Sequence, residues 1–315
     1  MRALVLDEGV RFDEAYPDPT PLDGDVLVEV RRAGVCETDL QLVRGYMGFR
    51  GVLGHEFVGV ARSGPWAGQR VVGEINCSCG VCDTCRAGRP SHCPDRTVVG
   101  IRKRDGAFAD FICLPQRNLH RVPDSLPDEV AVFTEPVAAA CRIPTQIDVR
   151  RDDRIVVLGD GRLGNLCAQV LARLSSHVLV VGKHEAKLAR LRAVGLATAR
   201  VSDVSRERVA DIVVDCTGSE TGLPTALELV RPRGTIVLKT TVAGTQTMPW
   251  APLVVDEVTL VGSRCGPFDR ALEALESGAV DVRGLVTHRL PLARGAEALE
   301  IAASASALKV LLEIA

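Results

Sequence analysis

The stretch DRIVVLGDGRLGNLCAQVLARL, residues 153–174, decides the fold. It begins with the aliphatic run IVVL, continues through a turn that contains Gly159, Gly161 and Gly164, and ends in apolar residues at helical spacing. In a strand–turn–helix context, G-x-G-x-x-G glycines permit a tight turn and a close approach of the backbone to a pyrophosphate. The first helical turn adds N–H groups that attract phosphate. The stretch therefore predicts a dinucleotide site.

The segments that follow alternate between buried strands and helices. HVLVVG (177–182), DIVVDCTG (211–218) and GTIVLKT (234–240) are expected to be strands, and EAKLARLRAVG (185–195) a helix. This alternation predicts an α/β fold with a doubly wound parallel sheet. Before residue 136, short strands broken by glycine and proline predict a compact all-β unit instead.

Composition restricts the classes of protein. With 315 residues, of which 46% are hydrophobic, the chain can bury a core without disulfides. No segment has the roughly 20 apolar residues of a membrane helix, and charges at Arg2, Asp7 and Glu8 oppose a signal peptide. A net charge of −2 argues against a nucleic-acid partner. We expect a cytoplasmic protein in which thiols stay reduced and clustered cysteines indicate metal.

Five cysteines lie between residues 77 and 93. Four of them, Cys79, Cys82, Cys85 and Cys93, follow the spacing C-x2-C-x2-C-x7-C. Four thiolates complete a tetrahedral shell, so this lobe is predicted to hold a structural zinc ion. Cys77 lies outside the spacing and is expected to be an ordinary strand residue.

Two short stretches upstream offer ligands for a second metal ion. GVCETDL (34–40) contains Cys36, and GHEFVG (54–59) contains His55. A thiolate and an imidazole are ligand types of catalytic zinc, which keeps one coordination position open. Taken alone, each residue is more often an ordinary buried side chain.

The order of these motifs carries a resemblance. GVCETD, GHEFVG, the four-cysteine lobe, TEPVAAAC (134–141), GDGRLG, THRLPL and ALKVLLEI resemble those of zinc-dependent medium-chain dehydrogenases of the alcohol and sorbitol dehydrogenase type. The resemblance implies a GroES-like all-β catalytic domain at 1–136 and a Rossmann domain at 137–266. A C-terminal segment, 267–315, is expected to return to the catalytic domain. It further implies hydride transfer between a nicotinamide cofactor and an alcohol or polyol, or the corresponding aldehyde or ketone, in a homodimer or homotetramer.

The same resemblance assigns roles to residues. Cys36, His55 and Glu135 match the catalytic zinc ligands, and Glu56 matches a carboxylate that can enter or leave the metal shell. Asp39 matches the group that orients the ligand histidine, and Thr38 matches a hydroxyl that relays the alcohol proton. Gln41 departs from the pattern, because many relatives have a relay histidine there. Cofactor contacts are expected from Gly159, Gly161, Arg162, Leu163, Gly164, Gly182, Lys183, His184, Thr217 and Lys309.

The end of the second strand bears on the choice of cofactor. NAD-preferring Rossmann domains place an acidic residue about 20 positions after the glycine motif. This chain has Gly182, Lys183 and His184 there, and no acidic residue before Glu185. A cationic side chain suits the 2′-phosphate of NADP, so NADP is favoured over NAD, and Gly182→Asp is expected to reverse the preference.

Other functions remain open at this point. A zinc-independent quinone or enoyl reductase on the same fold would not need Cys36, His55 and the lobe together. A non-catalytic NADP-binding regulatory protein would keep the glycine motif without an open metal site. A metal-binding nucleic-acid module fits neither the charge nor the cysteine spacing.

Overall fold

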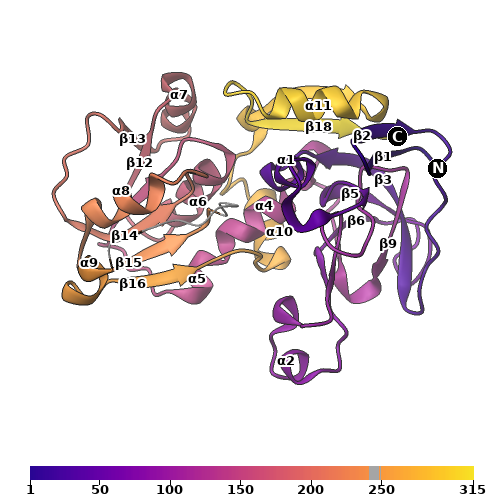
Figure 1. Cartoon of the computed structure of the whole chain (residues 1–315), viewed down its shortest axis with the longest axis horizontal. Helices are drawn as coiled ribbons and strands as arrows, with labels where there is room; N and C mark the ends of the chain where they lie inside the picture. Colours follow the sequence, from indigo (N-terminus) through magenta and orange to yellow (C-terminus); the bar gives the residue numbers. More distant parts are fainter. Residues whose placement is uncertain (241–247, 249) are drawn as a thin grey trace. The chain divides into compact units, whose positions relative to one another are not determined.

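A computed structural model describes residues 1–240, 248 and 250–315 of the chain. The chain divides into two compact units. Figure 1 colours the ribbon by residue number, from indigo at the N-terminus to yellow at the C-terminus. Unit 1 comprises Met1–Glu135 and Leu285–Ala315, and unit 2 comprises Pro136–Gly284.

Unit 1 is built on strands that are mostly antiparallel. Within the described residues, its largest sheet has seven strands, in the order β10, β6, β5, β3, β18 and β17, with β9 also pairing with β3. Their bounds are β3 (Asp25–Gly34), β5 (Glu56–Ala61), β6 (Arg70–Gly73), β9 (Phe111–Pro115), β10 (Leu119–Arg121), β17 (Val286–Pro291) and β18 (Lys309–Glu313).

Smaller elements complete unit 1. The strands β2 (Val10–Asp13), β1 (Ala3–Leu6) and β4 (Gly51–Val52) form one small sheet, and β7 (Asn76–Cys77) pairs with β8 (Thr97–Val98). The α-helices are α1 (Glu37–Val43), α2 (Asp83–Arg86), α3 (Asp128–Ala131) and α11 (Gly295–Ala302), and α4 (Thr134–Cys141) runs across the unit boundary. Short 3-10 helices of unit 1 are η1 (Tyr46–Gly48), η2 (Pro90–His92), η3 (Gln116–Asn118) and η5 (Leu292–Arg294), and η4 (Arg283–Leu285) runs across the second unit boundary.

The C-terminal strand closes the sheet of unit 1 between elements distant in sequence. β18 pairs with β3 through Leu311 opposite Gly34, and β17 lies parallel to it on its other side. Figure 1 shows β18 and α11 (yellow) beside the N-terminal strands. The chain thus returns to the unit in which it began, as the resemblance implies.

Unit 2 has the parallel sheet that the glycine-rich stretch predicts. Its six described strands lie in the order β13, β12, β11, β14, β15 and β16, and all pairs are parallel. Their bounds are β11 (Arg154–Leu158), β12 (His177–Gly182), β13 (Ala197–Arg200), β14 (Ala210–Asp215), β15 (Val230–Leu238) and β16 (Thr259–Gly262). This order is that of a doubly wound Rossmann sheet, so the predicted fold class is confirmed.

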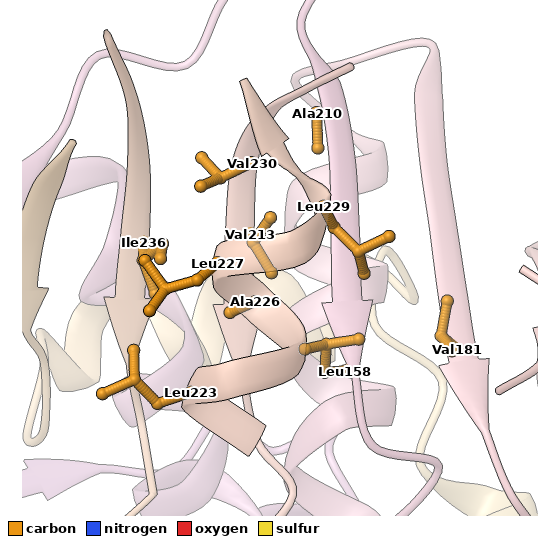
Figure 2. Packing of buried hydrophobic residues seen from close by; sticks show 10 residues of the cluster. All are labelled: Leu158, Val181, Ala210, Val213, Leu223, Ala226, Leu227, Leu229, Val230 and Ile236. Atoms are coloured by element: carbon orange, nitrogen blue, oxygen red, sulfur yellow. The ribbon is translucent and has the colours of Figure 1, made fainter. Parts of the chain in front are cut away.

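Helices cover the sheet of unit 2. Those packed on its strands are α6 (Arg162–Ala172), α7 (Glu185–Ala193) and α8 (Gly222–Leu229). The unit also contains α5 (Ile143–Gln146), α9 (Ala251–Val255) and α10 (Phe268–Glu276). Figure 2 shows how α8 packs: Leu223, Ala226 and Leu227 lie among strand residues such as Val213 and Ile236. The inner strands β11, β12 and β14 are largely buried on both faces, and their sequences are accordingly rich in aliphatic residues.

The boundary between unit 2 and the returning segment lies further along the chain than the expected residue 267. Residues 267–284 belong to unit 2, because α10 buries Phe268 and Leu272 there. In addition, the side-chain amide of Gln169 donates to the carbonyl oxygen of Asp281 at 2.9 Å. In the described part of the chain, no helix has the length and apolarity needed to span a membrane.

The cluster in Figure 2 supports a stability prediction. Leu229 is 3% exposed, so Leu229→Ala should lower the free energy of unfolding by about 2–5 kcal/mol through lost burial and a cavity. Val209, in the same unit, is 45% exposed. Val209→Ala should therefore change the free energy of unfolding by less than about 0.5 kcal/mol. Urea unfolding followed by circular dichroism compares the two variants. Equal effects would contradict this assignment of the core.

Candidate functional site

The four cysteines of the lobe converge around α2. Cys82 is the N-cap of α2 and Cys85 lies within the helix, while Gly80 and Gly88 turn the flanking chain with positive φ angles of 77° and 74°. The sulfur atoms of Cys82 and Cys85 are 3.5 Å apart, and those of Cys82 and Cys93 are 3.8 Å apart. Cys79 lies 4.0 Å from Cys85 and 3.5 Å from Cys93.

These distances fit a metal ion. In a tetrahedron with Zn–S bonds of about 2.3 Å, neighbouring sulfur atoms are about 3.8 Å apart. The backbone N–H groups of Val81 and Cys82, together with the Cys93 side chain, lower the pKa of the Cys79 thiol to about 6. Thiolate is the form that binds zinc, so the lobe suits a closed zinc site. Cys77 is a buried residue of β7, and burial raises the pKa of its thiol to about 11.

A second donor set forms where two strands of unit 1 meet. Gly34, the last residue of β3, pairs with Glu56, the first residue of β5. Cys36 follows β3 as the N-cap of α1, and His55 immediately precedes β5. This register explains why two motifs about 20 residues apart come together. The donor atoms of Cys36, His55 and Glu56 lie within 4.8 Å of one another.

Asp39 supports both ligands of this donor set. One carboxylate oxygen of Asp39 accepts the backbone N–H of Cys36 at 2.8 Å, and the other lies 3.2 Å from Nδ1 of His55. Asp39 is 0% exposed and His55 is 3% exposed. Since Nδ1 faces the carboxylate, Nε2 is the nitrogen left for a metal ion. The structure places Asp39 beside both Cys36 and His55, and its role in orienting a ligand histidine stays a prediction.

The electrostatics of the donor set favour a cation. Burial lowers the pKa of His55, but the Asp39 carboxylate and the Cys36 thiolate outweigh it and raise this pKa well above its ordinary value. One carboxylate oxygen of the buried Glu56, Oε2, is paired with the ammonium of Lys309, and the other, Oε1, has no hydrogen-bond partner among the described residues. Buried carboxylate oxygens without hydrogen bonds are costly, so the arrangement fits a metal ion.

Lys309, the first residue of β18, occupies an unexpected position. Its ammonium group forms an ion pair with Glu56, and both side chains are 0% exposed. It also lies 5.4 Å from the centre of the Phe133 ring. Burial lowers the pKa of Lys309 to about 8, although Cys36 and Asp39 act in the opposite direction. The expected contact of Lys309 with the cofactor stays a prediction, because the structure shows the residue engaged with Glu56.

The remaining expected residues of unit 1 lie at varying distance from this set. Thr38 is half-buried in α1, with its hydroxyl oxygen 3.9 Å from the sulfur of Cys36. Gln41 donates to the carboxylate of Glu37 at 2.7 Å. Glu135 lies in the first turn of α4, and it is Glu56 that joins Cys36 and His55 in the compact donor set. The role of Glu135 as a ligand remains a prediction.

The glycine-rich turn of unit 2 has the close approaches that its pattern predicts. Gly159 has a φ of 115°, and a Cβ at this position would lie 2.7 Å from the carbonyl oxygen of Cys216. A Cβ at Gly164 would overlap the carbonyl oxygen of Gly159. In contrast, the space around Gly161, the N-cap of α6, is open. Arg162 and Leu163 begin α6, so the turn presents the helix N-terminus that a pyrophosphate requires.

Residues after the neighbouring strands lie at the same edge of the sheet. Gly182 ends β12, and Lys183 and His184 follow it, both exposed. Thr217 follows β14, where its backbone N–H and hydroxyl both donate to the buried carboxylate of Asp215. Carboxyl ends of parallel strands form the ligand-binding edge of such sheets. Asp160, which no sequence pattern singled out, contacts Lys183 and His184 at this edge.

A Rossmann unit joined to a strand-rich unit with one closed and one open donor set defines a metal-dependent oxidoreductase. Comparisons with known proteins agree. Residues 22–124 match the family model described as alcohol dehydrogenase GroES-like domain, and residues 163–278 match zinc-binding dehydrogenase.

Individual relatives span the whole chain. It is 29% identical over 340 residues to a sorbitol dehydrogenase of Halalkalibacterium halodurans, and the alignment covers 99% of both chains. It is 26% identical to an L-threonine 3-dehydrogenase of Anaeromyxobacter sp. strain K, again over 99% of both. A solved zinc-binding dehydrogenase of Sinorhizobium meliloti 1021 bound to NADP has 25% identity, covers 99% of both chains and superposes with a TM-score of 0.89.

The chain therefore belongs to the zinc-dependent medium-chain alcohol dehydrogenase family. It is an oxidoreductase of the alcohol dehydrogenase type, as the resemblance implied. The zinc-independent and non-catalytic alternatives lose their support, because the chain retains both donor sets.

The two donor sets predict the metal content. After reconstitution, elemental analysis should find two zinc ions per chain, one at the four-cysteine lobe and one at the Cys36 site. Cys82→Ser should remove the lobe zinc and destabilise the lobe, because three thiolates leave the shell incomplete. Cys77→Ser, the neighbouring control outside the sulfur cluster, should retain both ions. A single zinc in the wild-type protein, or loss of zinc in Cys77→Ser, would refute the assignment.

Proposed function

We propose that the chain transfers hydride between NADP and an alcohol or polyol, or the corresponding aldehyde or ketone. The observation that carries this proposal is the open donor set, in which Cys36, His55 and Glu56 meet with their donor atoms within 4.8 Å. Zinc bound there supplies a Lewis acid that lowers the pKa of an alcohol. The nicotinamide ring of the bound cofactor supplies the hydride acceptor or donor.

The residues of the chain itself prepare the site. Cys36 and His55 bind the metal ion, and Asp39 fixes the tautomer and orientation of His55. Glu56, which is paired with Lys309, and Glu135 would be the alternative carboxylate ligands of the metal ion. A carboxylate is exchanged more readily than a thiolate at zinc, which leaves a coordination position for substrate.

Thr38 is the proposed first acceptor of the alcohol proton, since a hydroxyl group can both donate and accept. Gln41 cannot titrate and is bound to Glu37, so it cannot continue the relay. The proton would therefore leave Thr38 through the ribose of the cofactor, through water or through another group.

The choice of NADP rests on the strand end in unit 2. Lys183 and His184 are exposed there, and the position of Gly182 carries no acidic side chain that would repel a 2′-phosphate. A cytoplasmic location and a homodimer or homotetramer are proposed from composition and from the family.

Removing a ligand of the open site should stop turnover. We expect Cys36→Ser and His55→Ala each to lower kcat by at least about a hundredfold, because the Lewis acid contributes several kcal/mol to the barrier. The affinity for NADP, measured by fluorescence titration, should stay within about threefold of wild type, since the turn and strand end lie in unit 2.

Cys113→Ser is the matched control for these variants. Cys113 is a buried thiol of β9, and burial raises its pKa to about 11, so it should be inert. The variant should keep wild-type kcat. If Cys36→Ser retained activity within about tenfold of wild type, the metal-dependent mechanism would be wrong.

Cofactor choice has its own test. Lys183→Ala should weaken NADP binding about tenfold or more and leave NAD binding nearly unchanged, because an ammonium contact to a phosphate contributes about 1.5–3 kcal/mol. Arg173→Ala removes the same charge at the C-cap of α6 and should change neither affinity. Calorimetric titration with both cofactors distinguishes these results. Tighter binding of NAD than NADP by the wild-type chain would overturn the choice.

A further inference from the structure

Asp160 stands between the first two glycines of the turn and is 8% exposed. One of its carboxylate oxygens accepts the backbone N–H of Lys183 at 2.7 Å and that of His184 at 2.6 Å. The other lies 3.1 Å from Nδ1 of His184. Burial raises the pKa of Asp160, but the His184 and Lys183 donors outweigh it, so that the net pKa is lowered. The ionised carboxylate can only accept, so Nδ1 of His184 must be the donor.

The side chain of Asp160 fills the space that Gly182 leaves empty. A Cβ at Gly182 would lie 2.5 Å from both Cβ and Oδ2 of Asp160. The register of the sheet causes this contact, because Leu158 pairs with Val181 and the two chains continue side by side. In related NAD-binding sheets the strand-end residue is itself acidic and faces the adenosine ribose. Here the carboxylate at that place comes from the glycine-rich turn.

The expected effect of Gly182→Asp therefore needs correction. An aspartate at position 182 would collide with Asp160 rather than simply add acceptors for the ribose. Any change of cofactor preference in that variant would include the displacement of Asp160 and of the backbone that it holds.

The carboxylate of Asp160 is buried and faces protein donors. Its oxygens are engaged by two backbone N–H groups and one imidazole N–H, so little accepting capacity is left for a ribose hydroxyl. Lys183 is exposed, and the side chain of His184 is 48% exposed. A ligand at this edge therefore meets the cationic ammonium and the imidazole before it meets the carboxylate.

We propose that Asp160 is the positioning residue for cofactor selection: it fixes the backbone of Lys183 and His184 and the His184 ring so that both side chains contact the 2′-phosphate of the adenosine ribose. The proposal rests on the proposed function insofar as it assumes a dinucleotide at the glycine-rich turn. It adds a residue that acts through its neighbours and does not itself touch the phosphate.

The test uses two fragments of the cofactor, 2′,5′-ADP and 5′-AMP, which differ only in the 2′-phosphate. Isothermal titration of the full chain measures both affinities without zinc chemistry or turnover. The wild-type chain should bind 2′,5′-ADP about tenfold or more tightly than 5′-AMP. Asp160→Ala should reduce 2′,5′-ADP binding by about tenfold and 5′-AMP binding by less than about threefold, because the two cationic groups lose their orientation.

Asp211→Ala is the matched control. Asp211 also accepts a backbone N–H, that of Arg154 at 2.7 Å, and a side-chain N–H, that of Arg231 at 2.6 Å. It lies near the start of β14, at the opposite end of the same sheet. Its loss should lower stability to a similar extent and leave the ratio of the two fragment affinities unchanged. Asp160→Asn keeps the side-chain volume and one acceptor oxygen, so its ratio of 2′,5′-ADP to 5′-AMP affinity should lie between those of the wild type and Asp160→Ala. It replaces Asp160→Ala in the test if that variant does not fold.

The outcomes separate this proposal from the proposed function. An unchanged ratio in both Asp160 variants would overturn the positioning role alone. Tighter 2′,5′-ADP binding with weaker 5′-AMP binding would show instead that the carboxylate contacts the ribose and opposes the phosphate. A wild-type chain that binds neither fragment would overturn the dinucleotide site and both proposals together. An enzyme without alcohol turnover would leave the fragment result standing.

Discussion

The buried ion pair between Glu56 and Lys309 joins the open donor set of unit 1 to the C-terminal strand β18. Both side chains are removed from water, so each charge requires the other or a metal ion to offset its desolvation. Their positions come from three strands: β3 ends at Gly34, β5 begins at Glu56, and β18 begins at Lys309. The returning C-terminal segment is therefore part of the candidate active site. Losing either partner would leave an uncompensated charge beside Cys36 and His55.

In both candidate sites, one aspartate contacts a backbone N–H group and the ring of a histidine. In unit 1, Asp39 binds the backbone N–H of Cys36 with one oxygen and approaches Nδ1 of His55 with the other. In unit 2, Asp160 binds the backbone N–H of His184 and also contacts Nδ1 of its ring. Each aspartate thus fixes a loop and the orientation of an imidazole at once. The two histidines differ in exposure. His55 is buried beside the other candidate metal ligands, whereas about half of the His184 side chain is exposed to solvent.

Local sequence patterns predicted much of this architecture. The aliphatic runs, the glycine-rich turn and the spacing of the four lobe cysteines depend on residues close in the chain, and the structure forms each as expected. Features that depend on distant pairings were not predictable in the same way. The partnership of Lys309 with Glu56 requires β18 to pair with β3, and the later boundary of unit 2 requires the contact of α6 with Asp281. The contacts of Asp160 with Lys183 and His184 depend on the register of β11 with β12, which the sequence does not give. The acidic residue within the glycine pattern was nevertheless a visible signal.

We propose that one chain holds two chemically different zinc ions, one in a closed site of four thiolates and one in an open site with a single thiolate. X-ray absorption at the zinc edge of the reconstituted wild-type protein tests it most directly, because sulfur ligands at about 2.3 Å and nitrogen or oxygen ligands at about 2.0–2.2 Å give separate shells. We expect a spectrum that requires both shells. A spectrum described by sulfur ligands alone would contradict it.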